Sequence, residues 1–189
     1  CDITLPAPNM TGVLKIGGVI TQGSVEFLKA TSNAKENFYS YVGKSTATNN
    51  SGYFGLSMSP GTYRSRVYVW SKNNYYFGPA CVVPDSGSVT CDIDLPATNL
   101  RVQVASSSGV VQTAGTAILI SANFDGYRFD GSWINAQSAQ VGIFDLNLIN
   151  GNYTVTAYPG SNQKLGKPQI FNITIESSTV TSIKQLGSI

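Results

Sequence analysis

The chain has 189 residues, of which only 12% are charged, and its formal net charge is +2. This sparse and balanced charge offers no electrostatic surface for nucleic acid or an anionic membrane, and no apolar run approaches the ~20 residues that span a bilayer. Histidine is absent, which removes the commonest general base and a common metal ligand, so we expect a protein that is not an enzyme and uses no cofactor.

The first residues of the chain form a motif that returns later in the sequence. Residues 1–9 read CDITLPAPN and residues 91–99 read CDIDLPATN, an offset of 91 minus 1, or 90 residues. The same offset relates three further pairs: Phe54 to Phe144, Gly61 to Gly151, and Tyr63 to Tyr153. A chain that repeats at domain length is built from copies of one module. We predict that residues 1–6 are the closing strand of a preceding module, residues 7–96 are one module and residues 97–189 a second, as in a piece of a longer tandem array.

Short segments of alternating hydrophobicity follow one another through both modules. Their period of two and their lengths are typical of strands, and Gly, Pro, Asn and Ser separate them. The strands predicted in the first module cover residues 13–16, 24–28, 53–58, 62–70, 81–83 and 89–95. Those of the second module cover residues 100–105, 116–121, 143–148, 153–158, 170–175 and 180–186. About seven strands per module predict an all-β chain of two tandem seven-stranded antiparallel β-sandwiches.

A glycine stands two residues before each of the two matched tyrosines. Gly61 precedes Tyr63, and Gly151 precedes Tyr153. A strand that reverses through such a glycine needs a positive φ there. We expect each tyrosine to begin the return strand with its ring in the core between the sheets.

Two of the three cysteines flank a turn. Cys81 and Cys91 are equidistant from Ser86, so in a hairpin centred there they would be cross-strand neighbours, close enough for a disulfide. We predict a Cys81–Cys91 bond; the alternative is a pair of reduced, buried thiols. Such a bond indicates an oxidising, extracytoplasmic location. Cys1 matches Cys91, so its natural partner would be the counterpart of Cys81 in a preceding module.

One segment of the second module combines oxygen ligands with aromatic residues. Asn123, Asp125 and Asp130 lie beside glycines and are weak candidates for calcium, although Asp-Gly is also ordinary turn chemistry, which we favour. Candidate ligand-contact aromatics in the loops of both modules are Trp70, Tyr75, Tyr76, Tyr127, Phe129 and Trp133. Exposed aromatic rings beside amides can stack on sugars, but packing is the favoured interpretation.

The segment of residues 49–63, NNSGYFGLSMSPGTY, resembles the core pattern of carboxypeptidase-regulatory-like domains. These belong with the transthyretin-like (prealbumin-like) and collagen-adhesin B-type modules. Residues 142–153 carry a weaker version of the pattern. The resemblance implies transthyretin-like or Ig-like sandwiches of a bacterial-type surface protein, and it says little about function, because fold and function are separate claims.

Together these patterns predict a non-catalytic structural or adhesion fragment, a stalk or adhesin, located outside the cell or on its surface. Its expected partners are neighbouring modules of the same parent chain, and a glycan or a host or cell-surface protein, but neither nucleic acid nor the membrane interior. The alternative is a carbohydrate-binding accessory module of a secreted enzyme that uses the exposed aromatic loops.

Overall fold

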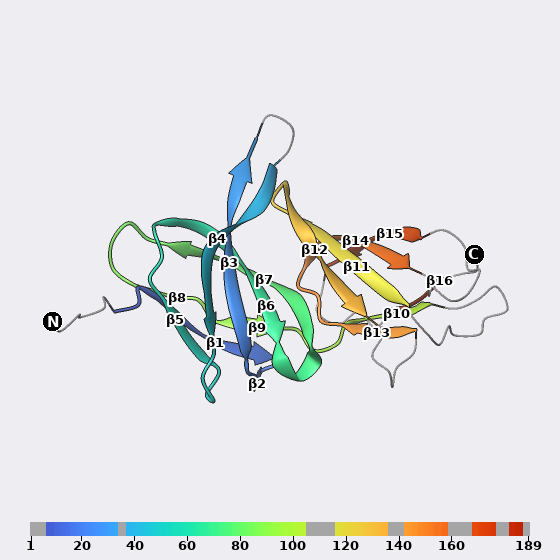
Figure 1. Cartoon of the computed structure of the whole chain (residues 1–189), viewed down its shortest axis with the longest axis horizontal. Helices are drawn as coiled ribbons and strands as arrows, with labels where there is room; N and C mark the ends of the chain where they lie inside the picture. The colour runs from blue at the N-terminus through green and yellow to red at the C-terminus, as the bar shows by residue number, and fades with distance from the viewer. Residues whose placement is uncertain are drawn as a thin grey trace. The chain divides into compact units, whose positions relative to one another are not determined.

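A computed structural model describes residues 7–33, 37–104, 116–135, 142–158, 168–176 and 182–186 (Figure 1). The chain divides into two compact units, Cys1–Leu95 and Pro96–Ile189. The regular elements described are strands, apart from one short 3-10 helix, so the chain is all-β. Among the described residues, no helix has the length and apolar character needed to cross a membrane.

The first sheet of unit 1 is organised around its first strand, β1 (Met10–Ile16). On one side β1 pairs antiparallel with β5 (Tyr53–Leu56). On the other side it pairs in parallel with β8 (Val89–Thr90) and then β9 (Ile93–Leu95). The short β2 (Val19–Ile20) pairs antiparallel with the end of β1.

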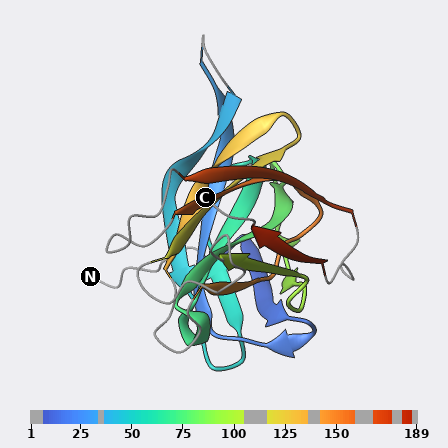
Figure 2. The same cartoon turned by 90° about the vertical axis from the view of Figure 1, so that its right-hand side faces the viewer.

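The second sheet of unit 1 has the strand order β4-β3-β6-β7, and all of its pairs are antiparallel. Its strands are β3 (Gly23–Ser32), β4 (Asn37–Ala47), β6 (Gly61–Val69) and β7 (Asn74–Val83). The 3-10 helix η1 (Trp70–Lys72) connects β6 to β7. The hairpin of β3 and β4 projects beyond the rest of the unit in both ribbon views (Figures 1 and 2).

The core of unit 1 lies between these two sheets, where alternate residues of each strand point inward. Leu14 of β1 and Val67 of β6 are both fully buried. Phe27 of β3 and Phe54 of β5 meet across the sandwich with ring centroids 6.0 Å apart.

Unit 2 repeats this arrangement of strands. In one sheet, β10 (Leu100–Val104) pairs antiparallel with β13 (Ile143–Leu146) and parallel with β16 (Ser182–Leu186). The other sheet includes the antiparallel order β15-β14-β11-β12. Its strands are β11 (Ala117–Phe124), β12 (Tyr127–Asn135), β14 (Gly151–Tyr158) and β15 (Gln169–Ile175). Phe124 packs edge-on against Phe129 and Tyr153 in the core, with centroids 6.1 and 5.8 Å apart.

The prediction for the two matched tyrosines is confirmed. Gly61 and Gly151 have φ of 145° and 157°, and the rings of Tyr63 and Tyr153 are buried. Each hydroxyl donates a hydrogen bond to the carbonyl four residues earlier: Tyr63 to Ser59 at 2.9 Å, and Tyr153 to Ile149 at 2.6 Å.

Two matched asparagines also make the same bonds in the two units. The Asn9 amide donates to the Met58 carbonyl at 2.8 Å and accepts from the Met58 N–H at 2.7 Å. The Asn99 amide makes the same pair of bonds to Leu148, at 2.6 and 2.9 Å. The 90-residue offset of the sequence is therefore also an offset of specific hydrogen bonds.

The structure corrects the predicted fold in two respects. The sandwiches are not purely antiparallel, because the last strand of each unit lies parallel to its first strand. Two strands, β4 and β12, lie in segments for which the sequence predicts no strand. The predicted closing strand at residues 1–6 falls outside the described residues.

Candidate functional site

A disulfide joins the two sheets of unit 1. Cys81 lies on β7 of one sheet, and Cys91 lies between β8 and β9 of the other, with their Cα atoms 5.9 Å apart. The predicted bond is present, but the predicted hairpin is wrong. Residues 84–88 cross from one sheet to the other. The bond therefore links the two sheets at one side of the sandwich, and it does not link neighbouring strands of one sheet.

The segment around Cys91 is held to β1 by backbone and carboxylate bonds. The Cys91 N–H donates to the Thr11 carbonyl at 2.7 Å. Where the parallel ladder is interrupted, the Asp92 carboxylate replaces a backbone acceptor and receives the Val13 N–H at 2.9 Å. The Asp94 carboxylate receives the Gly18 N–H at 3.0 Å in the turn after β1.

Gly12 allows the segment around Cys91 to approach β1 closely. A Cβ on Gly12 would lie 2.2 Å from the Cys91 carbonyl oxygen and 2.6 Å from the Phe54 ring. The repeat does not point to Gly12, because Val102 holds the matching position in unit 2. The role of Asp92 could have been suspected from the repeated motif, in which it matches Asp2, but Asp94 matches Thr4 and carries no such signal.

Unit 2 places an aliphatic residue where unit 1 has its first disulfide cysteine. Cys81 lies opposite Tyr63, and Ile173 lies opposite the matching Tyr153. The residue equivalent to Cys81 by strand register is therefore Ile173, whereas the sequence offset of 90 leads to Phe171.

The junction between the units is anchored at both ends. On the side of unit 1, the Gly17 N–H donates to the Leu95 carbonyl at 2.7 Å. On the side of unit 2, the Asn147 amide donates to the Pro96 carbonyl at 2.8 Å, and the Asn99 N–H donates to the Leu146 carbonyl at 2.9 Å. The last bonded residue of unit 1, Leu95, and the first bonded residue of unit 2, Pro96, are therefore consecutive in the chain.

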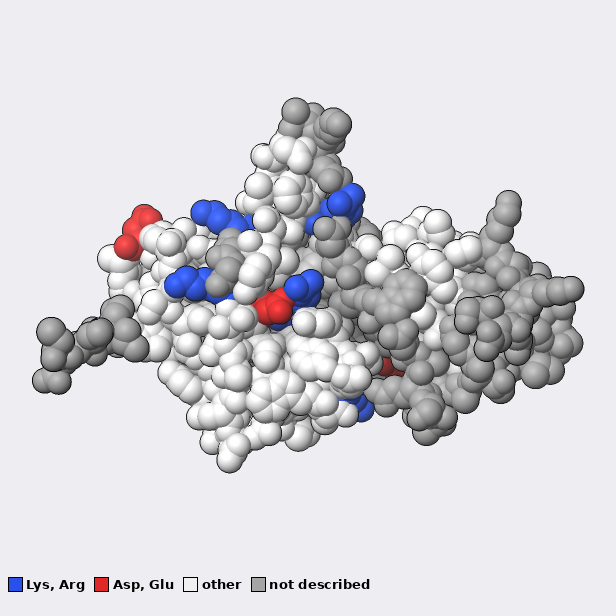
Figure 3. Space-filling model, viewed as in Figure 1, with Lys and Arg blue, Asp and Glu red and all other residues white. Residues whose placement is uncertain are grey.

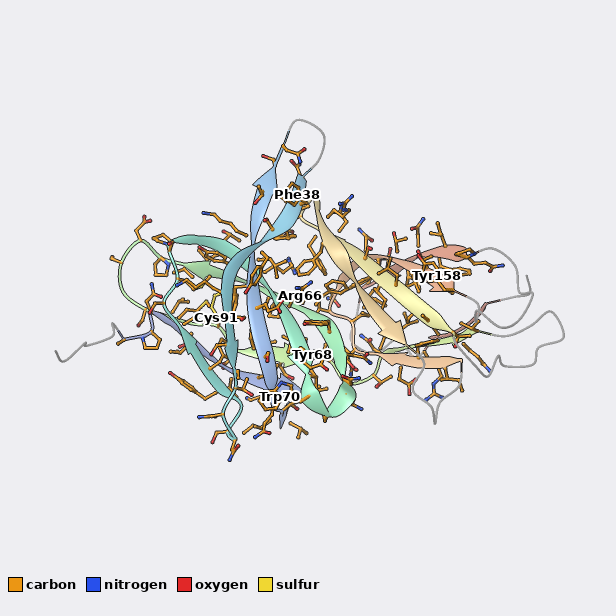
Figure 4. All side chains as sticks on the ribbon, in the orientation of Figure 1. Phe38, Arg66, Tyr68, Trp70, Cys91 and Tyr158 are labelled. Carbon is orange, nitrogen blue, oxygen red and sulfur yellow. A yellow bond between two sulfur atoms is a disulfide. The ribbon has the colours of Figure 1, made fainter. Side chains whose placement is uncertain are left out.

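The aromatic candidates of unit 1 lie on strands and on η1, not in a long loop. Arg66, Tyr68 and Trp70 follow one another along β6 into η1 (Figure 4). Arg66 pairs with Glu26 at 2.6 Å and lies over the Tyr75 ring, 4.9 Å from its centroid. Tyr75 also packs against Tyr68, with the two ring centroids 4.9 Å apart. Trp70 is 45% exposed.

Tyr76 is the exception in this group, because it lies in the core. It is 3% exposed, and burial raises the pKa of its phenol above the ordinary value of 10.0, against a smaller lowering by a hydrogen bond with Asn74. Its proposed contact with a ligand is wrong for the folded protein, and the packing interpretation holds.

The aromatic segment of unit 2 is a hairpin rather than a loop. Asp125 and Gly126 have φ of 55° and 80° and form the two-residue turn between β11 and β12, as expected for an Asp-Gly turn. Phe129 is fully buried and Tyr127 is half-buried, so Phe129 cannot contact a ligand. The side chain of Trp133 lies outside the described set.

Two of the three calcium candidates, Asn123 and Asp125, have described side chains, and the calcium hypothesis stays a prediction. Asn123 is exposed on β11, Asp125 is in the turn, and the side chain of Asp130 is outside the described set. Within the described parts of the chain, no group of three or more His, Cys, Asp or Glu could hold a metal ion. Charge is sparse on the described surface seen in Figure 3, where most residues are neither acidic nor basic.

Neither a family model nor a curated protein matches this sequence. Three solved structures that the chain resembles are a streptococcal ancillary pilin, the Bacillus anthracis TIE protein, and GBS52, the minor pilin of Streptococcus agalactiae. Their identities are 12%, 12% and 14%, and their TM-scores are 0.34, 0.38 and 0.32. The matches cover 95%, 96% and 95% of this chain, and 62%, 33% and 95% of those chains. The chain thus spans less than two thirds of the first two.

Those likenesses are too distant to decide function. The resemblance to carboxypeptidase-regulatory-like and transthyretin-like modules stays a prediction, because no family model matches.

Proposed function

We propose that this chain is a non-catalytic, extracellular structural or adhesion fragment whose two modules carry tension in series, as in a stalk or adhesin. The proposed modules are residues 7–96 and 97–189. Among the described residues, unit 2 has seven strands, and unit 1 has seven when β8 and β9 are taken as one closing strand and the two-residue β2 is left out.

The observation that carries this proposal is the parallel pairing of the first and last strands. In unit 1, Met10 lies beside Val89 and Ile16 beside Leu95. A pull on the chain before Met10 and after Leu95 therefore draws the two strands past each other along their length. The interstrand bonds run across that direction, so they are loaded together rather than one after another.

The same geometry recurs in unit 2. Leu100 lies beside Ser182 and Val104 beside Leu186, again in parallel. Pro96 restricts the junction, since proline fixes its own φ and limits the residue before it. Tension would thus pass from β9 through a short junction into β10.

Unit 1 has a second connection that unit 2 lacks. If the closing strand detached from β1, the chain would still be held to β7 through the Cys81–Cys91 bond. A persistent disulfide favours an oxidising location outside the cytoplasm.

Single-molecule force spectroscopy on the full chain, held near its two ends, tests the proposal. We expect two unfolding events at forces well above those that peel a hairpin. As an internal control, handles at positions 62 and 82, which are paired neighbours on β6 and β7, should open the same unit by peeling at a lower force. Equal forces in the two pulling geometries would contradict the proposal.

The disulfide provides a length signature in the same experiment. The two cysteines are ten residues apart in the sequence, and the bond holds their Cα atoms 5.9 Å apart. At ~3.5 Å per extended residue, less that distance, reduction should lengthen the unit 1 event by about 30 Å. The unit 2 event should not change.

A further inference from the structure

The outer face of β14 and β15 carries a regular set of amides and hydroxyls. Asn152 lies opposite Thr174, and Thr154 lies opposite Asn172. These residues line a shallow hollow of about 460 Å³, which continues onto β11. We propose that this hollow, the amide face, binds an uncharged, hydroxyl-rich ligand such as a neutral saccharide chain.

Cross-strand bonds fix the orientation of the two amides. The Thr174 hydroxyl donates to Asn152 Oδ1 at 2.9 Å, and the Thr154 hydroxyl donates to Asn172 Oδ1 at 3.0 Å. Because each Oδ1 accepts the bond from the neighbouring strand, each Nδ2 is directed away from that neighbour with its two donors. The amides are therefore held in place before a ligand arrives, which reduces the entropy lost on binding.

The face extends by one strand on the side of β11. Asn123 lies opposite Asn152, and Ser121 lies opposite Thr154. Two polar rows thus run across three strands, with spacings of about 4.8 Å between strands. Amides and hydroxyls both donate and accept hydrogen bonds, which suits the hydroxyl groups of a sugar.

The mixed polar and apolar character of the face suits a neutral ligand of this class. Among the described residues, no carboxylate lines the hollow and one charged side chain, Arg128, does, so uncharged amides and hydroxyls make up most of its polar lining. Ile170, two residues before Asn172 and therefore on the same side of β15, is 68% exposed. It offers an apolar contact for the C–H face of a sugar ring.

The fold does not require these polar residues, as a comparison of the units by strand register shows. The Asn152–Thr174 pair corresponds to Thr62–Val82, and the Thr154–Asn172 pair corresponds to Arg64–Ala80. The framework asparagines and tyrosines recur in both units, but the amide face does not. It is a property of unit 2 alone, which separates it from the mechanical role proposed for both units.

Affinity electrophoresis of the full chain through gels containing laminarin, xylan, galactomannan or yeast mannan tests the proposal, with heparin as an anionic comparison. We expect retardation by at least one neutral polysaccharide. The double variant Asn172→Ala/Thr174→Val installs the residues of unit 1, and it should weaken that binding about tenfold through the loss of two hydrogen bonds. The matched control Val82→Thr, at the equivalent position of unit 1, should bind as the unaltered chain does.

Three results would overturn the proposal: no retardation by any neutral polysaccharide, binding confined to heparin, or binding that the double variant leaves intact. If the double variant does not fold, Asn152→Thr, which copies Thr62, provides the same test with a smaller change. Loss of binding in Trp70→Ala but not in the amide variants would place the site on unit 1 and would also overturn the proposal.

Discussion

The side-chain amide of Asn99 holds the backbone of Leu148 through two hydrogen bonds, one to its carbonyl at 2.6 Å and one from its N–H at 2.9 Å. Both residues are buried. The bonds attach the residue just before β10 to the loop after β13, next to the point where the chain enters unit 2. Asn9 and Met58 have the same relationship in unit 1, so each unit fixes the start of its first strand in the same way.

Replacing Asn99 with alanine should therefore destabilise unit 2. The change leaves two buried backbone groups of Leu148 without partners, which we expect to lower the free energy of unfolding by about 3 kcal/mol. Amide hydrogen exchange in β14 measures the effect. Asn123→Ala, an exposed change on β11, should have an effect within about 0.5 kcal/mol. A loss from Asn99→Ala no larger than this control would show that the bonds do not stabilise the entry strand.

Removing the disulfide should destabilise unit 1 alone. Chain-entropy reasoning assigns about 3 kcal/mol to a crosslink between residues ten apart. Exchange of β6 and β9 amides in Cys81→Ser/Cys91→Ser should accelerate accordingly, while exchange of β14 amides in the same molecule provides the control. Peptide mapping without reduction should recover residues 81 and 91 linked, and their separate recovery as free thiols would show that the bond does not form.

The sequence predicted the strands with a clear alternation better than the strands of mixed polarity. β14 shows a clear alternation, because Tyr153 and Val155 are buried while Thr154 is not. β4 and β12 are rich in Tyr, Ser, Gly and Asn, and each was missed. A strand of mixed polarity lacks the period-two contrast on which such a prediction depends.

The pairing of Cys81 and Cys91 could be predicted, but its geometry could not. A short segment between two strands is consistent with a hairpin, yet a crossing between the two sheets of a sandwich needs as few residues. The spacing does not distinguish them, since in both cases the cysteines come within bonding distance. The amide face was missed for a related reason. Asn152 and Asn172 are 20 residues apart in the sequence, and only the strand register places Thr174 opposite Asn152 and Thr154 opposite Asn172.

The close contact at Gly12 provides a third prediction. In Gly12→Ala the new methyl group would first meet the Cys91 carbonyl, which cannot withdraw without parting β1 from the closing strand. We expect unit 1 to lose about 3 kcal/mol of stability. Gly87→Ala is the control, because Gly87 has a φ of 86° and open space around it, so its cost of about 1 kcal/mol is conformational only. Similar losses from the two variants would contradict the steric role of Gly12.

Tyr76 should make unit 1 sensitive to alkaline pH. Burial raises the pKa of its phenol above the ordinary 10.0 in the folded protein, so the folded state favours the neutral form. The corresponding stability is complete below pH 10 and is lost as the pH rises from the unfolded pKa through the folded one. Tyr76→Phe keeps the ring and removes the ionisable group, so the free energy of unfolding of unit 1 should fall less between pH 9 and pH 11 in this variant. Tyr127→Phe, at a half-buried tyrosine of unit 2, should leave the pH dependence of unit 1 as it is. If Tyr76→Phe loses stability as steeply as the unaltered chain, ionisation of the buried phenol is not what limits unit 1 at high pH.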